Sequence, residues 1–237
     1  MNLKSLLYLS LVLAALLNST TSLHAQKKAP SAGFSLVTWE ASSFEPIYYR
    51  QGEDYIPIKL MPGNRSDLFE LKGMTSLGLY VAEESEEGEQ TYKLVGKTSI
   101  PQGISRILFF ITERDDPGKL PLRLSGIDDS LLTFPRGACR FVNLTNVPLA
   151  VRFADKTSLI KAKGMTVVES KVEASGGLLP FIVFDRKGTN LYENRYFAQQ
   201  IGRDMIFILP PKRQGGRVNI KLLPQLVPHE PEEKKVN

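Results

Sequence analysis

The apolar runs of this chain are short, and their length constrains its fold more than any other feature. Beyond the N-terminus they have strand length, end at Gly, Pro, Asn or Asp, and are rich in β-branched and aromatic residues. Several alternate apolar with polar residues, which is the period of a half-buried strand. The clearest runs are residues 34–39, 56–60, 77–81, 104–111, 139–142, 149–153, 181–184, 205–209 and 217–222. Helical periodicity is scarce, so the pattern predicts an all-β fold made of antiparallel sandwiches.

Self-similarity adds a second constraint. The tetrapeptide Lys72-Gly73-Met74-Thr75 recurs as Lys163-Gly164-Met165-Thr166. Three further segment pairs match around it: 58–60 with 149–151, 77–81 with 180–184, and 106–111 with 204–209. The alternative is chance similarity between two β-rich stretches. We predict two tandem Ig-like β-sandwich modules, 34–115 and 131–223, that arose by internal duplication and are joined by a connector at 116–130.

The N-terminus has the pattern of a cleavable signal peptide. Lys4 precedes an uncharged apolar run, residues 6–17, which is shorter than the ~20 residues that a membrane span needs. Ala25 suits cleavage before Gln26, and Ser22 is the alternative cleavage point. An uncleaved amphipathic or buried helix is the competing interpretation. We expect a signal peptide at 1–25, a flexible segment at 26–33, and a mature chain in the periplasm or outside the cell.

Cysteine usage bears on the compartment. Cys139 is the only cysteine, so the chain cannot form an internal disulfide, whereas secreted eukaryotic domains usually contain them. This favours a bacterial envelope or secreted protein, with Cys139 as a small buried residue rather than a reactive thiol. No run after the signal peptide is long enough for an integral membrane segment. Residues 224–237 combine prolines with charges and predict a disordered tail.

Residues suited to catalysis or cofactor binding are few. His24 falls in the signal peptide and His229 in the tail, so neither is placed to act in a Ser-His-Asp or Cys-His catalytic site. With one Cys, one tail His and no Gly-rich phosphate loop, we expect neither a metal nor a cofactor. The net charge of +5 is spread along the chain, which does not predict nucleic acid as a partner.

Paired carboxylates leave one enzyme class open. Asp115-Asp116 and Asp128-Asp129, with the acidic loop at 83–89, are candidates for a carboxylate-dependent glycosidase. Such pairs more often cap backbone amides in turns, or point to opposite faces of a strand. We therefore expect a protein that is not an enzyme.

Aromatic residues crowd the first predicted module. Trp39, Tyr48 and Tyr49 form a candidate ligand or partner surface, because aromatic faces with polar neighbours stack on sugars and anchor protein partners. Core packing is the alternative role for them. In a strand Tyr48 and Tyr49 point to opposite faces, so at least one should belong to the core.

One element carries a family resemblance. Residues 140–145 (RFVNLT) and 148–152 (PLAVR), flanked by 129–137 and 203–211, look like a strand-turn-strand element of exported bacterial β-sandwich domains. The whole chain resembles uncharacterised exported proteins of environmental bacteria. The short element also resembles a strand pair in the accessory subunit of periplasmic alginate acetylation. Neither resemblance implies catalytic residues.

Together these observations predict an exported, non-catalytic β-sandwich protein of the cell envelope, with a binding or structural role. Its expected partner is an unknown envelope protein or a glycan. The alternative is a carbohydrate-binding or polysaccharide-processing accessory protein, for which the aromatic cluster is the support. A carboxylate-dependent glycosidase is the third interpretation.

Overall fold

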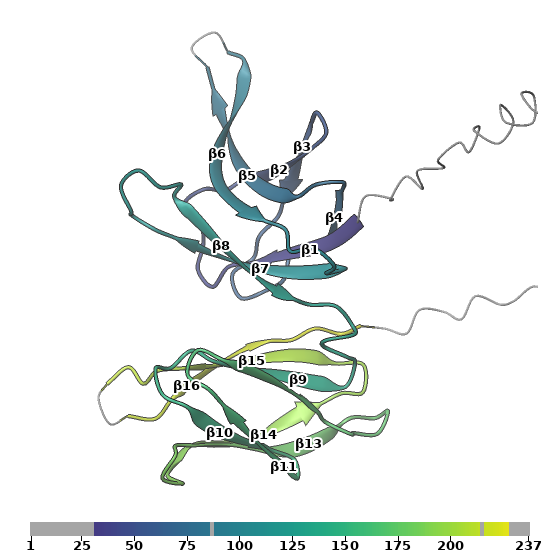
Figure 1. Ribbon diagram of the computed structural model, residues 1–237, viewed down its shortest axis with the longest axis vertical. Coiled ribbons are helices and arrows are strands. Elements are labelled where there is room, and N and C mark those ends of the chain that lie inside the picture. The colour runs from purple at the N-terminus through teal and green to yellow at the C-terminus, as the bar shows by residue number, and fades with distance from the viewer. Residues whose placement is uncertain (1–30, 86–87, 214–215, 228–237) are drawn as a thin grey trace, which may run out of the picture.

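The computed structural model describes residues 31–85, 88–213 and 216–227, which fold as strands and the turns between them (Figure 1). This confirms the all-β prediction. The described part of the chain holds no helix with the length and apolarity of a membrane span. The predicted signal peptide, its cleavage site at Ala25 and Gln26, most of the segment 26–33 and the tail from residue 228 onward lie outside the described residues.

The first eight strands, here called the N-terminal half, form one curled sheet in the order β3-β2-β5-β6-β8-β7-β1-β4. Its inward side chains, Phe34 and Phe109 among them, fill a single core. The sheet curls where β6 meets β8 at one pair, Gly96 opposite Leu122. A Cβ at Gly96 would lie 3.0 Å from Leu122 Cβ and 2.8 Å from Leu124 Cδ1, so this approach requires glycine. The strands are β1 (Ser31–Val37), β2 (Ile47–Gln51), β3 (Asp54–Ile58), β4 (Phe69–Lys72), β5 (Ser76–Glu84), β6 (Gln90–Ser99), β7 (Arg106–Glu113) and β8 (Leu122–Asp128).

The second eight strands, the C-terminal half, form two separate four-stranded sheets with the orders β11-β10-β13-β14 and β12-β9-β15-β16. A second core lies between them and includes Phe141, Phe153 and Phe181, with the Phe141 and Phe153 ring centroids 5.3 Å apart. The strands are β9 (Ala138–Asn143), β10 (Leu149–Phe153), β11 (Lys156–Ile160), β12 (Met165–Glu169), β13 (Gly177–Phe184), β14 (Asn190–Ala198), β15 (Arg203–Leu209) and β16 (Asn219–Leu223).

The two halves share one strand topology. In the N-terminal half β1 pairs antiparallel with β4 and parallel with β7, and β7 pairs antiparallel with β8. In the C-terminal half β9 pairs in the same ways with β12 and β15, and β15 with β16. The order β3-β2-β5-β6 likewise corresponds to β11-β10-β13-β14. Each strand of the N-terminal half therefore has its counterpart eight strands later.

The repeated tetrapeptide does not mark this correspondence. Lys72-Gly73-Met74-Thr75 ends β4 and leads into β5, whereas Lys163-Gly164-Met165-Thr166 leads into β12, the counterpart of β4. The match of 58–60 with 149–151 is also wrong, because it joins the end of β3 to β10, the counterpart of β2. These two sequence matches therefore do not follow the strand correspondence of the halves.

The matched segments 106–111 and 204–209 do belong to counterpart strands, β7 and β15, but their alignment is shifted by one residue. Strand pairing places Arg106 opposite Gly33 and Arg203 opposite Ala138, so Arg106 corresponds to Arg203. A shift of one residue exchanges the two faces of a strand, so that alignment pairs core residues with residues of the opposite face.

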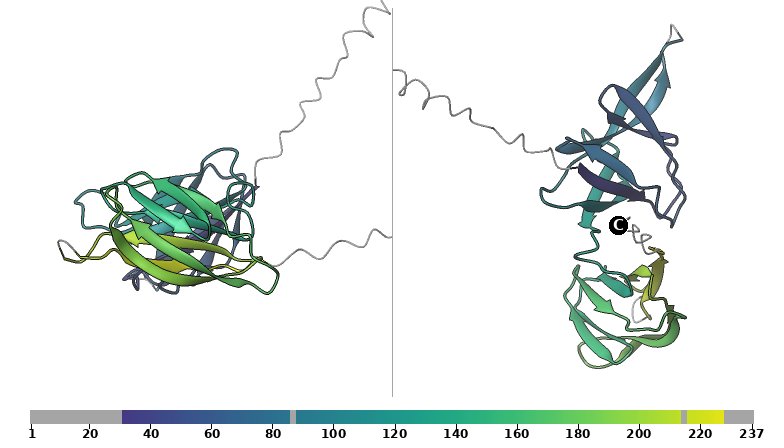
Figure 2. Two further views of the ribbon diagram at one scale, coloured as in Figure 1. Left: turned by 90° about the horizontal axis from the view of Figure 1, so that it is seen from below. Right: turned by 90° about the vertical axis from the view of Figure 1, so that its right-hand side faces the viewer.

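The halves stack in four layers along the long axis of the molecule (Figures 1 and 2). The two middle layers, β4-β1-β7-β8 and β12-β9-β15-β16, meet through a junction cluster of apolar side chains. At its centre the Phe207 ring lies 5.0 Å from the Trp39 ring and 5.4 Å from the Phe110 ring, centroid to centroid. The buried residues of the junction are Val37, Leu108, Phe134, Ala138, Val142, Met205, Phe207 and Leu223.

Two of the expected segment boundaries fall on structured residues. The range 116–130, expected as a connector, contains β8, which is hydrogen-bonded along its length to β7. At the other end, residues 224–227 pair with the C-terminal half: Gly202 bridges Leu226, and the Val227 amide donates to the Ile201 carbonyl at 2.9 Å.

The close approach at Gly96 yields a stability prediction. We expect Gly96→Ala to lower the free energy of unfolding by about 1–3 kcal/mol, because the added methyl group overpacks the contact between β6 and β8. Urea denaturation measures the effect. Gly177→Ala is the matched control, since a Cβ there meets Val172 Cγ1 at an ordinary 3.5 Å. Equal stabilities of the two variants would contradict the role given to Gly96.

Candidate functional site

The structure separates the three residues expected to form a ligand or partner surface. Tyr49 is 2% exposed, and its ring packs edge-on against Phe34 in the first core, with centroids 5.1 Å apart. Trp39 lies half-buried at the junction, where Lys221 Nζ is 4.9 Å from the indole centroid. Tyr48 points away from the core and lies half-buried on the outer face of its sheet. The prediction that one of the two adjacent tyrosines belongs to the core is therefore confirmed.

Tyr48 joins three other tyrosines on the outer face of β2, β3, β5 and β6. The Tyr55 and Tyr92 rings stack in parallel with centroids 3.8 Å apart. Tyr48 meets Tyr92 edge-on at 5.2 Å, and Tyr80 meets Tyr55 edge-on at 5.1 Å. The Arg50 guanidinium carbon lies 5.7 Å from the Tyr55 centroid. We call this group of four half-buried tyrosines with Arg50 the tyrosine surface.

Strand register brings these side chains together. Tyr48 stands directly opposite Tyr80, and Arg50 stands opposite Tyr55. Alternate residues of a strand share a face, and cross-strand neighbours on that face touch. The alternation in β2 is visible in the sequence, but Tyr80 and Tyr92 reach the site through pairing of β5 with β2 and β6, which no local pattern encodes.

A pocket of about 200 Å³ adjoins the tyrosine surface. Arg50, Tyr80 and Lys97 line it together with the apolar side chains of Met74 and Leu94. Gly78 also lines the pocket, and a Cβ there would lie 3.0 Å from the Tyr80 ring, so glycine lets the ring lie close to the strand backbone. Two cationic side chains beside an aromatic wall suit a ligand that carries an anionic group next to an apolar face.

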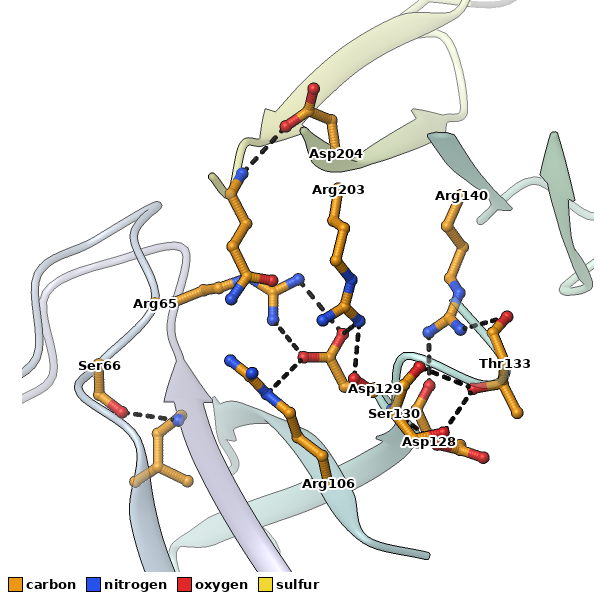
Figure 3. A network of polar contacts seen from close by, with 12 residues as sticks. Arg65, Ser66, Arg106, Asp128, Asp129, Ser130, Thr133, Arg140, Arg203 and Asp204 are labelled. Atoms are coloured by element: carbon orange, nitrogen blue, oxygen red, sulfur yellow. Dashed lines mark hydrogen bonds and ion pairs between the residues drawn. The ribbon is translucent and has the colours of Figure 1, made fainter. Parts of the chain in front are cut away.

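A second polar group lies at the junction and is drawn in Figure 3. Asp129, 1% exposed in its side chain, follows β8 and is contacted by three arginines (Figure 3). Arg65 Nη1 donates to Oδ2 at 2.7 Å, and Arg106 Nε lies 3.4 Å from the same oxygen. Arg203 Nη2 donates to Oδ1 at 3.1 Å and to the Asp129 backbone carbonyl at 2.6 Å.

A fourth arginine completes this arginine cluster, which we define as Arg65, Arg106, Arg140 and Arg203 around Asp128 and Asp129. Arg140 Nη1 donates to the Asp128 backbone carbonyl at 2.6 Å. Its guanidinium carbon and that of Arg203 lie 4.4 and 4.7 Å from the centroid of the Phe134 ring. The negative face of one phenylalanine thus offsets part of the charge of two guanidinium groups.

Burial dominates the electrostatics of the arginine cluster. Desolvation lowers the pKa of Arg203 to about 10 against the attraction of Asp129, and the neighbouring guanidinium groups act in the same direction as desolvation. Burial likewise lowers the pKa values of Arg65 and Arg140. All of these groups stay protonated at neutral pH, so the cluster is a charged structure inside the molecule.

Three of the carboxylates considered for catalysis have partners close to them in the sequence. Asp116 forms an exposed ion pair with Lys119 at 3.1 Å, and Glu83 pairs with Lys93 at 3.0 Å. Asp128 accepts a hydrogen bond from the Ser130 amide at 2.9 Å. Glu86 and Glu87 of the acidic loop lie outside the described residues.

Cys139 is buried, with 2% of its surface exposed, and packs in the second core. Desolvation, with a smaller contribution from Asp204, raises the pKa of its thiol far above the usual value. A thiol in such surroundings is not ionised at neutral pH, which agrees with a packing role.

Within the described ranges, no three His, Cys, Asp or Glu side chains lie close enough together to hold a metal ion. No protein-family model matches this chain, and no curated protein is significantly similar to it.

The role of Asp129 as the shared counter-charge can be tested by substitution. We expect Asp129→Asn to lower the free energy of unfolding by about 3–5 kcal/mol, because three guanidinium groups then lose their shared counter-charge inside the protein. Urea denaturation monitored by fluorescence measures this. Asp116→Asn, in a pair whose side chains are more than half exposed, is the matched control, with an expected change of about 0–1 kcal/mol. A small effect at both positions would mean that the cluster does not stabilise the junction.

Proposed function

We propose that this protein is exported and acts in the bacterial cell envelope as a non-catalytic binding protein. The tyrosine surface carries the proposal: four half-buried tyrosines and Arg50 gather on the outermost sheet layer of the N-terminal half. Tyrosine and arginine are enriched at protein interfaces and among the residues that dominate binding energy. An unidentified envelope protein is the proposed partner.

The contacts among the four rings support this role. Each ring packs against at least one other, so little side-chain freedom remains to be lost on binding. Tyrosine also combines an apolar ring with a hydroxyl that both donates and accepts hydrogen bonds. A preorganised surface of this kind resembles the tyrosine-rich surfaces with which antibodies bind proteins.

We further propose that the two halves are β-sandwich modules of Ig-like size that arose by duplication. The support is the strand-by-strand agreement of their pairings, including the parallel pairs β1·β7 and β9·β15. Apart from the single parallel pair that joins β6 to β8, the other pairings are antiparallel. The modules differ in one respect. The contact between β6 and β8 joins the strands of the N-terminal module into a single curled sheet, whereas the C-terminal module has two separate sheets.

The pocket beside the tyrosine surface favours a second candidate function, the binding of a glycan. Arg50 and Lys97 would face the carboxylate of an acidic sugar, and Tyr80 would stack on the apolar face of its ring. In this candidate the protein is an accessory of polysaccharide binding or processing.

Removing the stacked pair tests the binding role. We expect the double variant Tyr55→Ala, Tyr92→Ala to weaken partner binding by at least about 30-fold, the loss expected when a central aromatic anchor is truncated. The partner is captured on the wild-type protein from envelope extract, identified, and its Kd then measured with purified components. Phe197→Ala, 49% exposed on the outer face of the C-terminal half, is the matched control.

Two outcomes would contradict this proposal. One is equal affinity of the double variant and the wild type for the captured protein. The other is that no envelope component is captured. Retention of the wild type on an acidic polysaccharide column, lost in Arg50→Ala, would instead favour the glycan.

Export is tested separately. We expect expression of the full chain in a bacterium to give a periplasmic or secreted product that starts at Gln26, because Ala25 ends the predicted signal peptide. The intact mass of the fractionated protein measures this. A product that starts at Leu23 would move the cleavage site to Ser22, and an uncleaved cytoplasmic product would contradict export.

A further inference from the structure

The arginine cluster carries more positive than negative charge. Its four arginines face Asp128 and Asp129, and Asp204 lies close by. Counting all three carboxylates leaves one positive charge in excess among these described residues. The imbalance is greatest at Asp129, whose single carboxylate faces three guanidinium groups. Excess charge removed from water is costly unless a counter-charge approaches it.

The side chains of the other two carboxylates accept hydrogen bonds from groups outside the cluster. Asp204 accepts from the Tyr196 hydroxyl at 2.6 Å and from the Gln225 amide at 2.9 Å. Asp128 accepts from the Ser130 amide. Asp129 is therefore the carboxylate that forms ion pairs with the guanidinium groups.

Hydrogen-bond donors are in excess as well. Arg203 is fully buried, yet its Nε and Nη1 find no acceptor among the described residues, and the same holds for Nε of Arg65, Arg106 and Arg140. Unsatisfied buried donors cost free energy, and several in one place call for an acceptor that the chain does not supply.

The cluster reaches solvent at Arg106. Its side chain is 22% exposed, compared with 8% for Arg65 and 0% for Arg203. Arg65 and Arg106 contact the same oxygen of Asp129, so their guanidinium groups lie beside each other (Figure 3). The terminal nitrogens of Arg106 have no hydrogen-bond partner in the described part of the chain.

We propose that the arginine cluster binds a small oxyanion, such as phosphate or sulfate, beside Asp129 and between the guanidinium groups of Arg65 and Arg106. The terminal nitrogens of Arg106 form a fork that matches two oxygens of such an anion. Both terminal nitrogens of Arg65 donate to Asp129, so Arg65 offers its Nε as a further donor. A chloride ion has no pair of oxygens for the fork to bind. The anion neutralises the excess charge and accepts hydrogen bonds from donors that otherwise lack a partner. The site does not depend on the tyrosine surface and stands whether or not that surface binds a partner.

The anion site lies between the two halves, so a bound anion affects the stability of the junction. Arg106 begins β7 of the N-terminal half, and Arg203 begins β15 of the C-terminal half. An anion that offsets the repulsion between their charges stabilises the contact between the halves. The protein then resists unfolding more strongly in the presence of the anion, because a ligand bound to the native state alone stabilises that state by mass action.

Equilibrium binding tests the proposal on the whole protein. Radiolabelled inorganic phosphate is dialysed against the wild type in sodium chloride at constant ionic strength, and the thermal midpoint is followed over the same phosphate series. We expect saturable binding near one phosphate per chain, displaced by sulfate, with a thermal midpoint that rises over the same concentration range. Arg106→Gln should raise the Kd by about tenfold or more, because it removes a charged donor pair.

Two variants keep the test interpretable. Arg106→Lys keeps the charge but loses the fork, and is expected to bind with intermediate affinity. Arg152→Gln, an exposed arginine on the outer face of the C-terminal half, is the matched control and should bind as the wild type does. The proposal is overturned by an absence of saturable binding, by displacement with chloride as effective as with sulfate, or by equal binding in Arg106→Gln and the wild type.

Discussion

The relative placement of the two halves depends on the ion pairs that the buried carboxylate of Asp129 forms with arginines. Asp129 lies where the chain leaves β8 and passes toward β9, and it contacts arginines from three separate segments. Arg65 comes from the loop before β4, whereas Arg106 and Arg203 begin β7 and β15. Desolvation of these charges is offset only when all partners are in position, so we infer that the cluster also favours one arrangement of the halves over others.

The apolar part of the junction is built from counterpart residues of the two halves. Strand pairing makes Val37 the counterpart of Val142 and Phe110 the counterpart of Phe207, and all four lie at the junction. The two middle layers therefore meet through equivalent faces, as the subunits of a symmetric dimer do. In such an arrangement equivalent residues approach one another, and the rings of Phe110 and Phe207 are in contact.

The same equivalence of the two faces explains why positive charges gather at the junction. Arg106 and Arg203 are counterparts, so packing the equivalent faces together brings two positive charges to the junction. The connecting segment places Asp129 between them, which a pair of separate modules could not do. The residues between β8 and β9 are thus more than a covalent link: they supply the counter-charge that lets the two equivalent faces meet.

Much of the fold could be predicted from local pattern. Short alternating runs predicted the strands, and the run at 149–153 coincides with β10. The face assignment of Tyr48 and Tyr49 also followed from the two-residue period of a strand. Register between distant strands could not be predicted, because pairing partners lie far apart in the sequence. The repeated tetrapeptide therefore does not mark equivalent strands, and the sequence alignment of 106–111 with 204–209 hides the equivalence of Arg106 and Arg203 by a shift of one residue.

The candidate site was harder to predict than the fold for the same reason. Trp39, Tyr48 and Tyr49 are close in sequence, yet they lie at the junction, on the outer face and in the core. Tyr55, Tyr80 and Tyr92 come from three strands and meet only because the sheet order is β3-β2-β5-β6. The sequence offers Asp128-Asp129 as a candidate carboxylate pair, but its arginine partners come from loops and strand ends with no shared local pattern.

The stacking order of the layers finally limits where this protein can bind anything large. The middle layers cover each other at the junction, so the outer layers provide the broad faces that remain on the described residues. Their outer faces differ: Arg50 lies over Tyr55 in one half, and Arg152 lies over Phe184 in the other. On the outer face of the C-terminal half the large apolar side chains Leu159, Leu178 and Phe197 are at least 49% exposed, whereas tyrosine hydroxyl groups line the outer face of the N-terminal half. Because hydroxyl groups carry directional hydrogen bonds and alkyl groups do not, the face with the four tyrosines is better suited to discriminate among ligands.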